Sequence, residues 1–456
     1  MIEFWIDTVL DYSNDGALHS ISNTPLIHRS FNPTLTIVTA MRILYLSQYF
    51  PPEVGATQTR AYEMAKGLVR AGHHVTMIAE VPNHPSGIIH PCYRGKLYER
   101  AIFEGIDVIR VWVKASSTKT FGRRMAFYLS YMFMAIWAGL FISRKKYHVI
   151  YSTSPPLFVG AVGFVLSFLR RVPFVFEVRD LWPESAVVLG ELNNPLAVKW
   201  ATRLEEICYR RARRVVVATQ GIRRRLIDRG LPPESLVFIP NGASLNVFQP
   251  RPQQAKQRRA ALSLNGKFIV LYAGILGVAQ GMESLVEVAN QLSNDAQIHF
   301  LFIGEGPKKA EVAALVERAG LTNLTLLGEK PQADMPGYFS AADVALVPLR
   351  RLELFQGALP SKMFEAWACA CPVILSVDGE AREVLEKAQA GIYAPPQDTV
   401  AIAAAIINLK KHPDVRLDMG ERGRQFVIEN FSREKAAQTL EHLLRSIVEK
   451  GSSAHA

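Results

Sequence analysis

Two series of short, continuously apolar stretches run along this chain, and helical patterns separate most of them. The first series lies between residues 43 and 240, and the second lies between residues 268 and 375. Strands that are apolar on both faces and alternate with helices form parallel sheets that helices cover on both sides. Because about twenty-five residues between the series carry no strand pattern, the chain predicts two doubly wound α/β domains rather than one barrel.

The predicted strands follow directly from these apolar runs. They are Ile43–Ser47, Val75–Glu80, Val108–Val113, Val149–Thr153, Phe174–Val178, Val215–Thr219 and Leu236–Pro240, then Phe268–Ala273, Ile298–Ile303, Leu324–Leu327, Val344–Val347 and Pro372–Leu375. A polar, turn-rich and basic stretch from Pro240, "PNGASLNVFQPRPQQAKQRR", has the composition of a linker. We therefore expect a first domain over 41–240, a second over 241–430, and an amphipathic C-terminal helix over 431–456 that can return to the first domain.

Residues 1–40 form a polar, turn-rich segment without the basic start and long apolar core of a signal peptide. A buried strand begins abruptly after Met41. We expect residues 1–40 to be an extension outside the fold, so that deleting them leaves activity intact.

The positive charge of the chain is concentrated in the first predicted domain. Residues 41–240 contain 28 Lys and Arg against 14 Asp and Glu, whereas residues 241–456 contain 23 of each. A basic domain suggests an anionic surface as a partner. Since no nucleic-acid motif with interleaved aromatic residues occurs, we expect no nucleic acid and favour an anionic membrane surface.

One segment of the first domain is long and apolar enough to meet a membrane. Met125–Ile142 contains eighteen residues without a charge, close to the length of a spanning helix. Three alternatives stay open: a helix that lies in the plane of the membrane, a buried core helix, and a true span. Basic residues flank both ends: Arg123, Arg124, Arg144, Lys145 and Lys146.

The stretch "LPSKMFEAWACACPVI", residues 359–374, predicts a turn, a helix and a buried strand. Ser361 fits the N-cap, so the free N–H groups of the first turn would attract an anion. Lys362 offers a positive charge for phosphate, and Glu365, one turn later, can accept two hydrogen bonds from a vicinal diol such as ribose. Alternatively, Ser361 only caps the helix, and Lys362 and Glu365 form a surface pair.

Glycine-rich turns follow three other predicted strands and can bring the backbone close to a ligand. The candidate donor-binding residues in them are Gly55, Gly274, Gly277, Gly281, Gly304, Glu305 and Gly306. Each turn can equally be an ordinary strand-to-helix connection. Their position at the carboxyl ends of strands, where open parallel sheets bind ligands, favours a binding role.

The stretch "FVFEVRDLWPES", residues 174–185, places charges at the end of another buried strand. Asp180 could accept a hydrogen bond from an acceptor hydroxyl, and Arg179 could pair with phosphate. The alternative is an internal arginine–carboxylate clamp that holds the loop. Neither a D-x-D sequence nor a cluster of His and carboxylates with ligand spacing occurs, so we expect no metal and no cofactor.

The four cysteines form no C-x-x-C motif and no disulfide framework, which favours a reducing cytoplasm. They are Cys92, Cys208, Cys369 and Cys371.

Taken together, "PPEVGA", "PNG", "FIGEGP" and "LPSKMFEAWACACPVI" resemble the retaining, metal-independent GT-B glycosyltransferases of family 4. "STSPPLFVG", "FEVRDLWPES" and "YAGILGVAQG" are similar to the WbuB-like branch, which includes L-fucosamine transferases. The acid pair of the wider family would fall on Gly357 and Glu365, and its two loop cations on Ile275 and Gln280. The resemblance therefore leaves Lys362 and backbone amides to bind the diphosphate.

This resemblance implies a reaction: transfer of a sugar from a nucleotide-diphosphate sugar, expected to be UDP-linked, to a polyprenyl-linked or other lipid-linked glycan in the synthesis of O-antigen, capsule or a similar surface polysaccharide. Asp180, Arg179 and Lys362 are then the catalytic candidates. We expect a cytoplasmic protein at the inner face of the plasma membrane. A nucleotide-sugar epimerase of the same fold and a non-catalytic membrane-surface scaffold are the alternatives.

Overall fold

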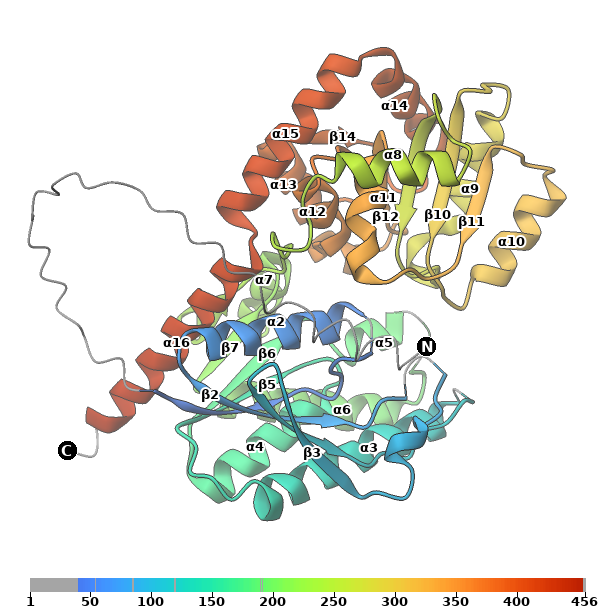
Figure 1. Cartoon of the computed structure of the whole chain (residues 1–456). Coiled ribbons are helices and arrows are strands. Elements are labelled where there is room, and N and C mark those ends of the chain that lie inside the picture. The colour runs from blue at the N-terminus through green and yellow to red at the C-terminus, as the bar shows by residue number, and fades with distance from the viewer. Residues whose placement is uncertain are drawn as a thin grey trace, which may run out of the picture. The chain divides into compact units, whose positions relative to one another are not determined.

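The computed structural model describes residues 40–53, 55–83, 86–118, 120–188, 190 and 192–453. The predicted N-terminal extension lies outside the described residues, except for Ala40. The described residues build two sheets, one from each series of predicted strands (Figure 1). The prediction of two doubly wound α/β domains is confirmed.

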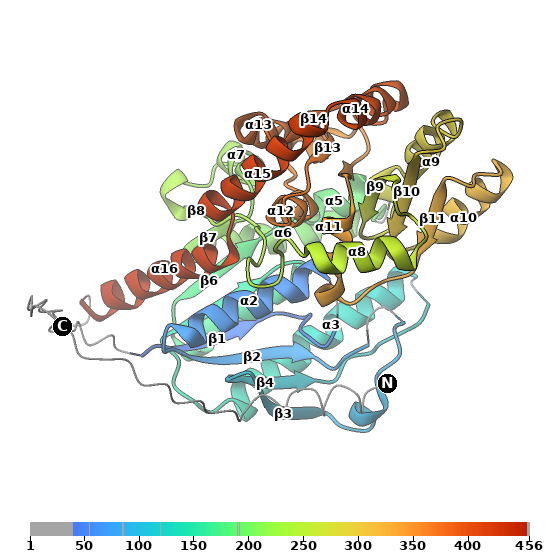
Figure 2. The same ribbon diagram turned by 45° about the horizontal axis from the view of Figure 1, so that its top comes forward.

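The first sheet has eight strands in the order β3-β4-β2-β1-β5-β6-β7-β8, and all neighbours are parallel except β3 and β4. Figure 2 shows β3 at its edge. The strands are β1 Arg42–Leu46, β2 His74–Glu80, β3 Tyr98–Phe103, β4 Ile106–Val111, β5 Val149–Thr153, β6 Phe174–Val178, β7 Arg214–Val217 and β8 Leu236–Phe238.

Helices cover both faces of this sheet. One face packs against α3, α4, α6 and α7, and the other packs against α2 and α16. The helices are α2 Ala56–Arg70, α3 Phe121–Trp137 with a π-helical continuation Ala138–Ile142, α4 Phe158–Arg170, α5 Glu184–Val188, α6 Pro195–Arg211, α7 Gln220–Asp228 and α16 Arg433–Ser453.

The second sheet has six parallel strands in the order β11-β10-β9-β12-β13-β14. They are β9 Phe268–Ala273, β10 Ile298–Ile303, β11 Leu324–Leu327, β12 Val344–Pro348, β13 Val373–Ser376 and β14 Gly391–Tyr393. Helices α11, α12, α13 and α15 pack on one face, and α9, α10 and α14 pack on the other. The helices of the second domain are α8 Pro252–Ala261, α9 Met282–Gln291, α10 Lys309–Arg318, α11 Met335–Ala341, α12 Ser361–Ala368, α13 Glu380–Ala388, α14 Thr399–Lys411 and α15 Pro413–Asn430.

The chain returns to the first sheet after α15. The N–H of Ala243 donates to the carbonyl of Phe431 at 3.0 Å, and the N–H of Arg433 donates to the carbonyl of Ala243 at 3.1 Å. Helix α16 then packs along α2, as Figure 1 shows. A contact of 3.0 Å between His73 Nε2 and Glu441 Oε1 ties α16 to the start of β2.

Three features of the sequence prediction were wrong. Strand β3 was missed because most of its side chains are exposed, so it shows no apolar run. Strand β14 was missed because it has only three residues. The stretch from Pro240 was predicted to be a linker, but its second half forms α8, which packs on α11 through Gln254 and Arg258 near Gly337.

Candidate active site

Helix α12 carries two of the predicted site residues, Lys362 and Glu365. Pro360 occupies the N-cap, and no side chain caps the helix, so the prediction that Ser361 is the N-cap was wrong. Because Pro360 fixes the entry of the chain, Ser361 becomes the first helical residue. The N–H of Met363, which was predicted to be free, donates to the carbonyl of Pro360 at 3.1 Å, but the helix N-terminus keeps the partial positive charge that attracts an anion.

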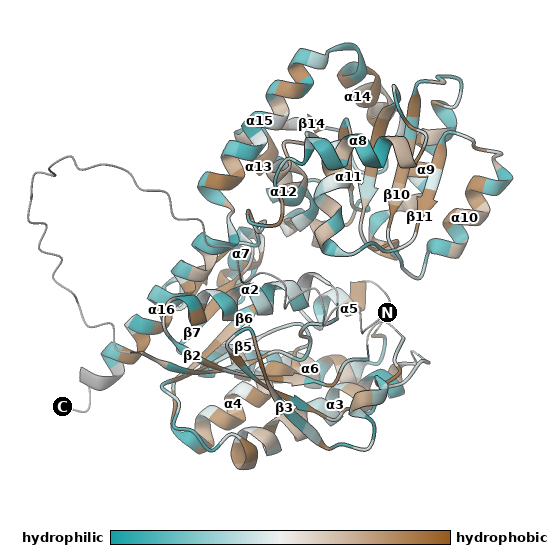
Figure 3. Cartoon of the chain, viewed as in Figure 1, coloured by the Kyte–Doolittle hydropathy of each residue, from teal (hydrophilic) through white to brown (hydrophobic). Residues whose placement is uncertain are grey.

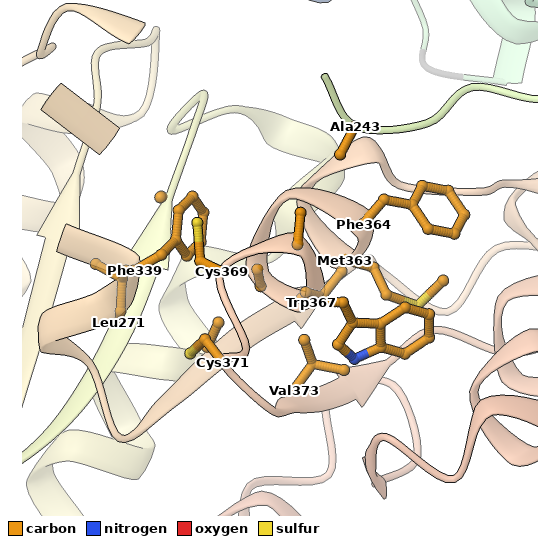
Figure 4. Close-up of a cluster of buried hydrophobic side chains, with 14 of the residues drawn as sticks. Ala243, Leu271, Phe339, Met363, Phe364, Trp367, Cys369, Cys371 and Val373 are labelled. Carbon is orange, nitrogen blue, oxygen red and sulfur yellow. The ribbon is translucent and has the colours of Figure 1, made fainter. Parts of the chain in front are cut away.

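The other face of α12 is fixed in the hydrophobic core. Met363, Phe364 and Trp367 are buried, and Figure 4 shows them among side chains from the sheet and from neighbouring helices. The indole Nε1 of Trp367 donates to the carbonyl of Ala390 at 2.8 Å. This anchoring determines where Lys362 and Glu365 lie.

Lys362 lies against the end of β9. Its Nζ donates to the hydroxyl of Tyr272 at 3.0 Å and lies 4.7 Å from the centre of the Tyr272 ring. A Cβ on Gly274 would lie 2.0 Å from Lys362 Cε, and the Gly274 backbone has a φ of 142°, which side chains rarely tolerate. Only glycine therefore fits beneath this lysine. Sequence analysis missed Tyr272, because in the apolar run "FIVLYA" it is indistinguishable from a core residue.

The turns after β9 and β10 pack against each other through their backbones. A Cβ on Gly304 would lie 1.9 Å from the carbonyl oxygen of Gly274, and one on Gly306 would lie 2.3 Å from that of Leu276. The N–H of Leu276 donates to the carbonyl of Glu305 at 2.9 Å. The Glu305 side chain instead pairs with Lys309 on α10. The glycines thus join the two turns into one backbone surface in front of Lys362.

Gly277 and Gly281 flank the short helix that leads into α9. Beside them the structure places a cation that sequence analysis missed: Arg350, from the loop after β12, with Cγ 3.3 Å from the position of a Cβ on Gly281. Its guanidinium pairs with Glu283 in the first turn of α9. No local pattern marks Arg350, because it is more than sixty residues away in the chain.

Glu365 faces the start of α16. Its Oε1 lies 3.4 Å from Nη2 of Arg433, and only 19% of its side-chain surface is exposed. Burial raises the pKa of Glu365, while Arg433 and Lys362 act to lower it. Lys362 and Glu365 turn to different partners, so the alternative of a surface pair between them was wrong.

Gly357 shows why the first acid of the family pair has no place here. A Cβ on Gly357 would lie 3.0 Å from Cα of Gly221 at the start of α7. The carboxylate of Glu380, on α13, accepts hydrogen bonds from the N–H groups of Gln220 at 2.8 Å and Gly221 at 2.6 Å. The backbone of α7 thus fills the space that a side chain at position 357 needs.

A buried arginine–carboxylate clamp forms at the end of β6, between Glu177 and Arg60. Glu177 is fully buried and accepts hydrogen bonds from Arg60 Nε at 2.8 Å and from Thr153 Oγ1 at 2.5 Å. Arg60 also donates to the carbonyl of Ile239 at 2.8 Å. The clamp thus joins α2, β6 and the end of the first domain without using Asp180. Burial lowers the pKa of Arg179 to about 10, against the opposing effect of Glu177.

Asp180 lies just beyond this clamp. It accepts a hydrogen bond from Ser185 Oγ at 2.8 Å. Burial raises its pKa, while this bond and the N–H of Leu181 act to lower it. The hydrogen bond from Ser185 thus fixes the Asp180 carboxylate beside α5. Gly55 precedes α2 as its N-cap residue and has no side-chain cap.

Among the described residues, no group of three or more His, Cys, Asp or Glu side chains could hold a metal ion.

Comparison with known proteins identifies this architecture. Residues 55–242 match the glycosyl transferase 4-like domain, and residues 253–426 match the glycosyl transferases group 1 family. The solved structure of HepE from Anabaena, in complex with UDP-glucose, superposes with a TM-score of 0.68 at 18% identity, covering 89% of this chain and 100% of that one. The fold is that of the GT-B glycosyltransferases. The chain is therefore a glycosyltransferase, with one domain from each of the two matched families.

Two curated relatives also carry glycosyltransferase names. WcaI of Escherichia coli K12, named for colanic acid biosynthesis, is 24% identical over 394 residues, which cover 84% of this chain and 96% of WcaI. WbjE of Pseudomonas aeruginosa is 28% identical over 296 residues, covering 64% of this chain and 72% of WbjE.

Proposed function

We propose that this glycosyltransferase moves a sugar from a nucleotide-diphosphate sugar to a lipid-linked acceptor during the synthesis of a bacterial surface polysaccharide. The observation that carries the proposal is the position of Lys362 at the start of α12, directly over the backbone of Gly274. One ammonium group, one helix N-terminus and a backbone surface without side chains together suit a diphosphate.

Each residue has a defined role in this proposal. Lys362 and the N–H groups of α12 stabilise the negative charge that develops on the departing diphosphate, without a metal ion. Glu365 accepts hydrogen bonds from the ribose diol. Asp180 accepts a hydrogen bond from the acceptor hydroxyl, and Arg179 supplies positive charge beside it. We propose retention of configuration, as in the family that the sequence resembles.

We propose a UDP-linked donor. From the resemblance to the WbuB-like branch, we further propose that the transferred sugar is an N-acetylated deoxyhexosamine. The bound UDP-glucose of HepE and the colanic acid pathway of WcaI support this choice of donor class and pathway. A thermal-shift screen of nucleotide sugars tests it, since a ligand stabilises the folded state according to its affinity. Product analysis with and without acceptor then separates a transferase from an epimerase. If no nucleotide sugar stabilises the protein, the proposal fails.

The proposed membrane contact involves α3 and α4 of the first domain. The segment Phe121–Ile142 is the one helix in the described part of the chain that is long and apolar enough to cross a membrane, and 22% of its most apolar window is buried. Phe133 and Phe141 are largely exposed, as are Phe168 and Leu169 at the end of α4. Figure 3 shows apolar colours along α4. We propose that this face docks on anionic lipid at the inner face of the plasma membrane.

Vesicle flotation tests the docking. Protein should float with anionic phosphatidylglycerol vesicles at low salt and be partly released at high salt, since each basic residue near such a surface contributes about 1 kcal/mol. Replacing Arg123, Arg144 and Lys146 by Glu should release it further. Replacing the exposed Lys256, Lys387 and Lys411 of the second domain by Glu is the matched control and should have little effect. Protein that ignores anionic vesicles at low salt would remove the main support for a lipid-linked acceptor.

A further inference from the structure

Arg433 is a buried cation at the point where the chain returns to the first domain. It is the first residue of α16, and its backbone N–H is bonded to Ala243. The stacked rings of Phe364 and Phe431, with centres 4.3 Å apart, fix this point against α12. Only 8% of the Arg433 side chain is exposed. The backbone at Arg433 is therefore held in place from two sides.

This guanidinium contacts a carboxylate on another helix. Nη2 lies 3.4 Å from Oε1 of Glu365 on α12, and Nη1 is buried without a hydrogen-bond partner. Burial raises the pKa of Glu63 on α2, and the charge of Arg433 acts to lower it. Burying an arginine without all of its hydrogen-bond partners costs folding free energy. We therefore expect such an arginine where its charge stabilises a neighbouring group.

Glu365 is that group. A largely buried carboxylate tends to take up a proton, and protonation turns one of its two acceptor oxygens into a hydroxyl, which weakens its binding to a diol. The other cation near Glu365 is Lys362, whose Nζ is already turned toward Tyr272. Arg433 is thus the cation placed to keep Glu365 ionised. Because it contacts Oε1, it also fixes the direction of Oε2.

We propose that Arg433 is a positioning residue for the donor ribose, acting through Glu365 and bringing the returning helix α16 into the donor site. This inference rests on the proposed function. Since α16 packs on α2 and its first residue, Arg433, contacts Glu365 on α12, the donor site depends on how the chain returns to the first domain. Arg433 does not itself touch the nucleotide in this proposal.

The test compares UDP with 2′-deoxy-UDP, which lacks one hydroxyl of the diol. In Arg433→Met the Kd for UDP should rise about tenfold, the effect of weakening one charge-assisted hydrogen bond. The Kd for 2′-deoxy-UDP should rise much less. Glu365→Gln should show the same pattern, and the double variant should be no worse than Glu365→Gln alone, because the two residues act in series.

The pH dependence of UDP binding gives a second measurement. The groups that face Glu365 are Arg433, Lys362 and the thiol of Cys369. Removing Arg433 takes away a cation that lowers the pKa of Glu365, so the variant should lose UDP affinity at a higher pH on acidification than the wild type does. Arg445→Met, which breaks a pair with Glu441 on the same helix, is the control and should leave UDP binding unchanged.

The outcomes separate the two proposals. If Glu365→Gln weakens UDP but Arg433→Met does not, or if Arg433→Met weakens UDP and 2′-deoxy-UDP equally, the role of Arg433 is refuted while the proposed function stands. If the wild type binds no UDP, GDP or ADP, both fall. Should Arg433→Met not fold, Arg433→Lys keeps the charge but loses the planar fork, and its UDP affinity should lie between those of the wild type and Glu365→Gln.

Discussion

Replacing Lys362 by Met separates a functional lysine from a structural one. In the free protein Lys362 makes one hydrogen bond to a neutral hydroxyl and one ring contact, both with Tyr272. The ring contact contributes about 0.5 to 1 kcal/mol at a part-exposed site, and the ammonium gains less from a neutral hydroxyl than from an anion. A hydrogen bond from an ammonium to a diphosphate contributes about 1.5 to 3 kcal/mol, which corresponds to roughly ten- to a hundredfold in affinity. The loss of binding should therefore exceed the loss of stability.

Titration calorimetry with UDP and UMP gives the sharpest assay for this substitution. Lys362→Met should lower UDP affinity roughly ten- to a hundredfold and UMP affinity far less, because the proposed function pairs the lysine with the terminal phosphate of UDP. Lys410→Met removes a lysine that pairs with Asp295 in the same domain and is the matched control. Equal weakening of UDP and UMP, or an effect no larger than that of the control, would refute the role of Lys362.

Three further predictions follow from individual residues and from the proposed chemistry. Glu365→Ala should lower UDP affinity roughly ten- to a hundredfold in calorimetry, and unchanged affinity would contradict its contact with ribose. Transferase activity should persist in EDTA; activity that chelation abolishes and Mg²⁺ restores would show a metal requirement. Burial raises the pKa of Asp107, but bonds from Arg100 and Lys145 outweigh it and lower the pKa to about 2. This carboxylate therefore stabilises the fold by up to about 2 kcal/mol above pH 4. In urea unfolding, the difference in stability between the wild type and Asp107→Asn should shrink as the pH falls from about 4 toward about 2. A difference that stays constant with pH would contradict this prediction.

Local sequence patterns predicted most of the sheet framework. Strands β5, β6, β9 and β10 have the predicted bounds, because a central parallel strand is buried on both faces and appears as a continuous apolar run. The edge strand β11 also has the predicted bounds. The glycines at the ends of β9 and β10 were also visible, since no other residue fits their backbone angles. Both kinds of signal come from the environment of one residue and its chain neighbours.

The partners of the site residues were decided only by tertiary structure. Lys362 turns to Tyr272, ninety positions away, and Glu365 turns to Arg433, sixty-eight positions away. From the sequence the two charges on α12 were equally compatible with pairing to each other, because i,i+3 spacing puts them on one helix face. Which partner an ionised group takes depends on the layers packed against its helix, and the return of α16 to the first domain brings Arg433 there. The periodicity of apolar residues along the chain indicates which positions are buried, but it does not indicate which layers pack together.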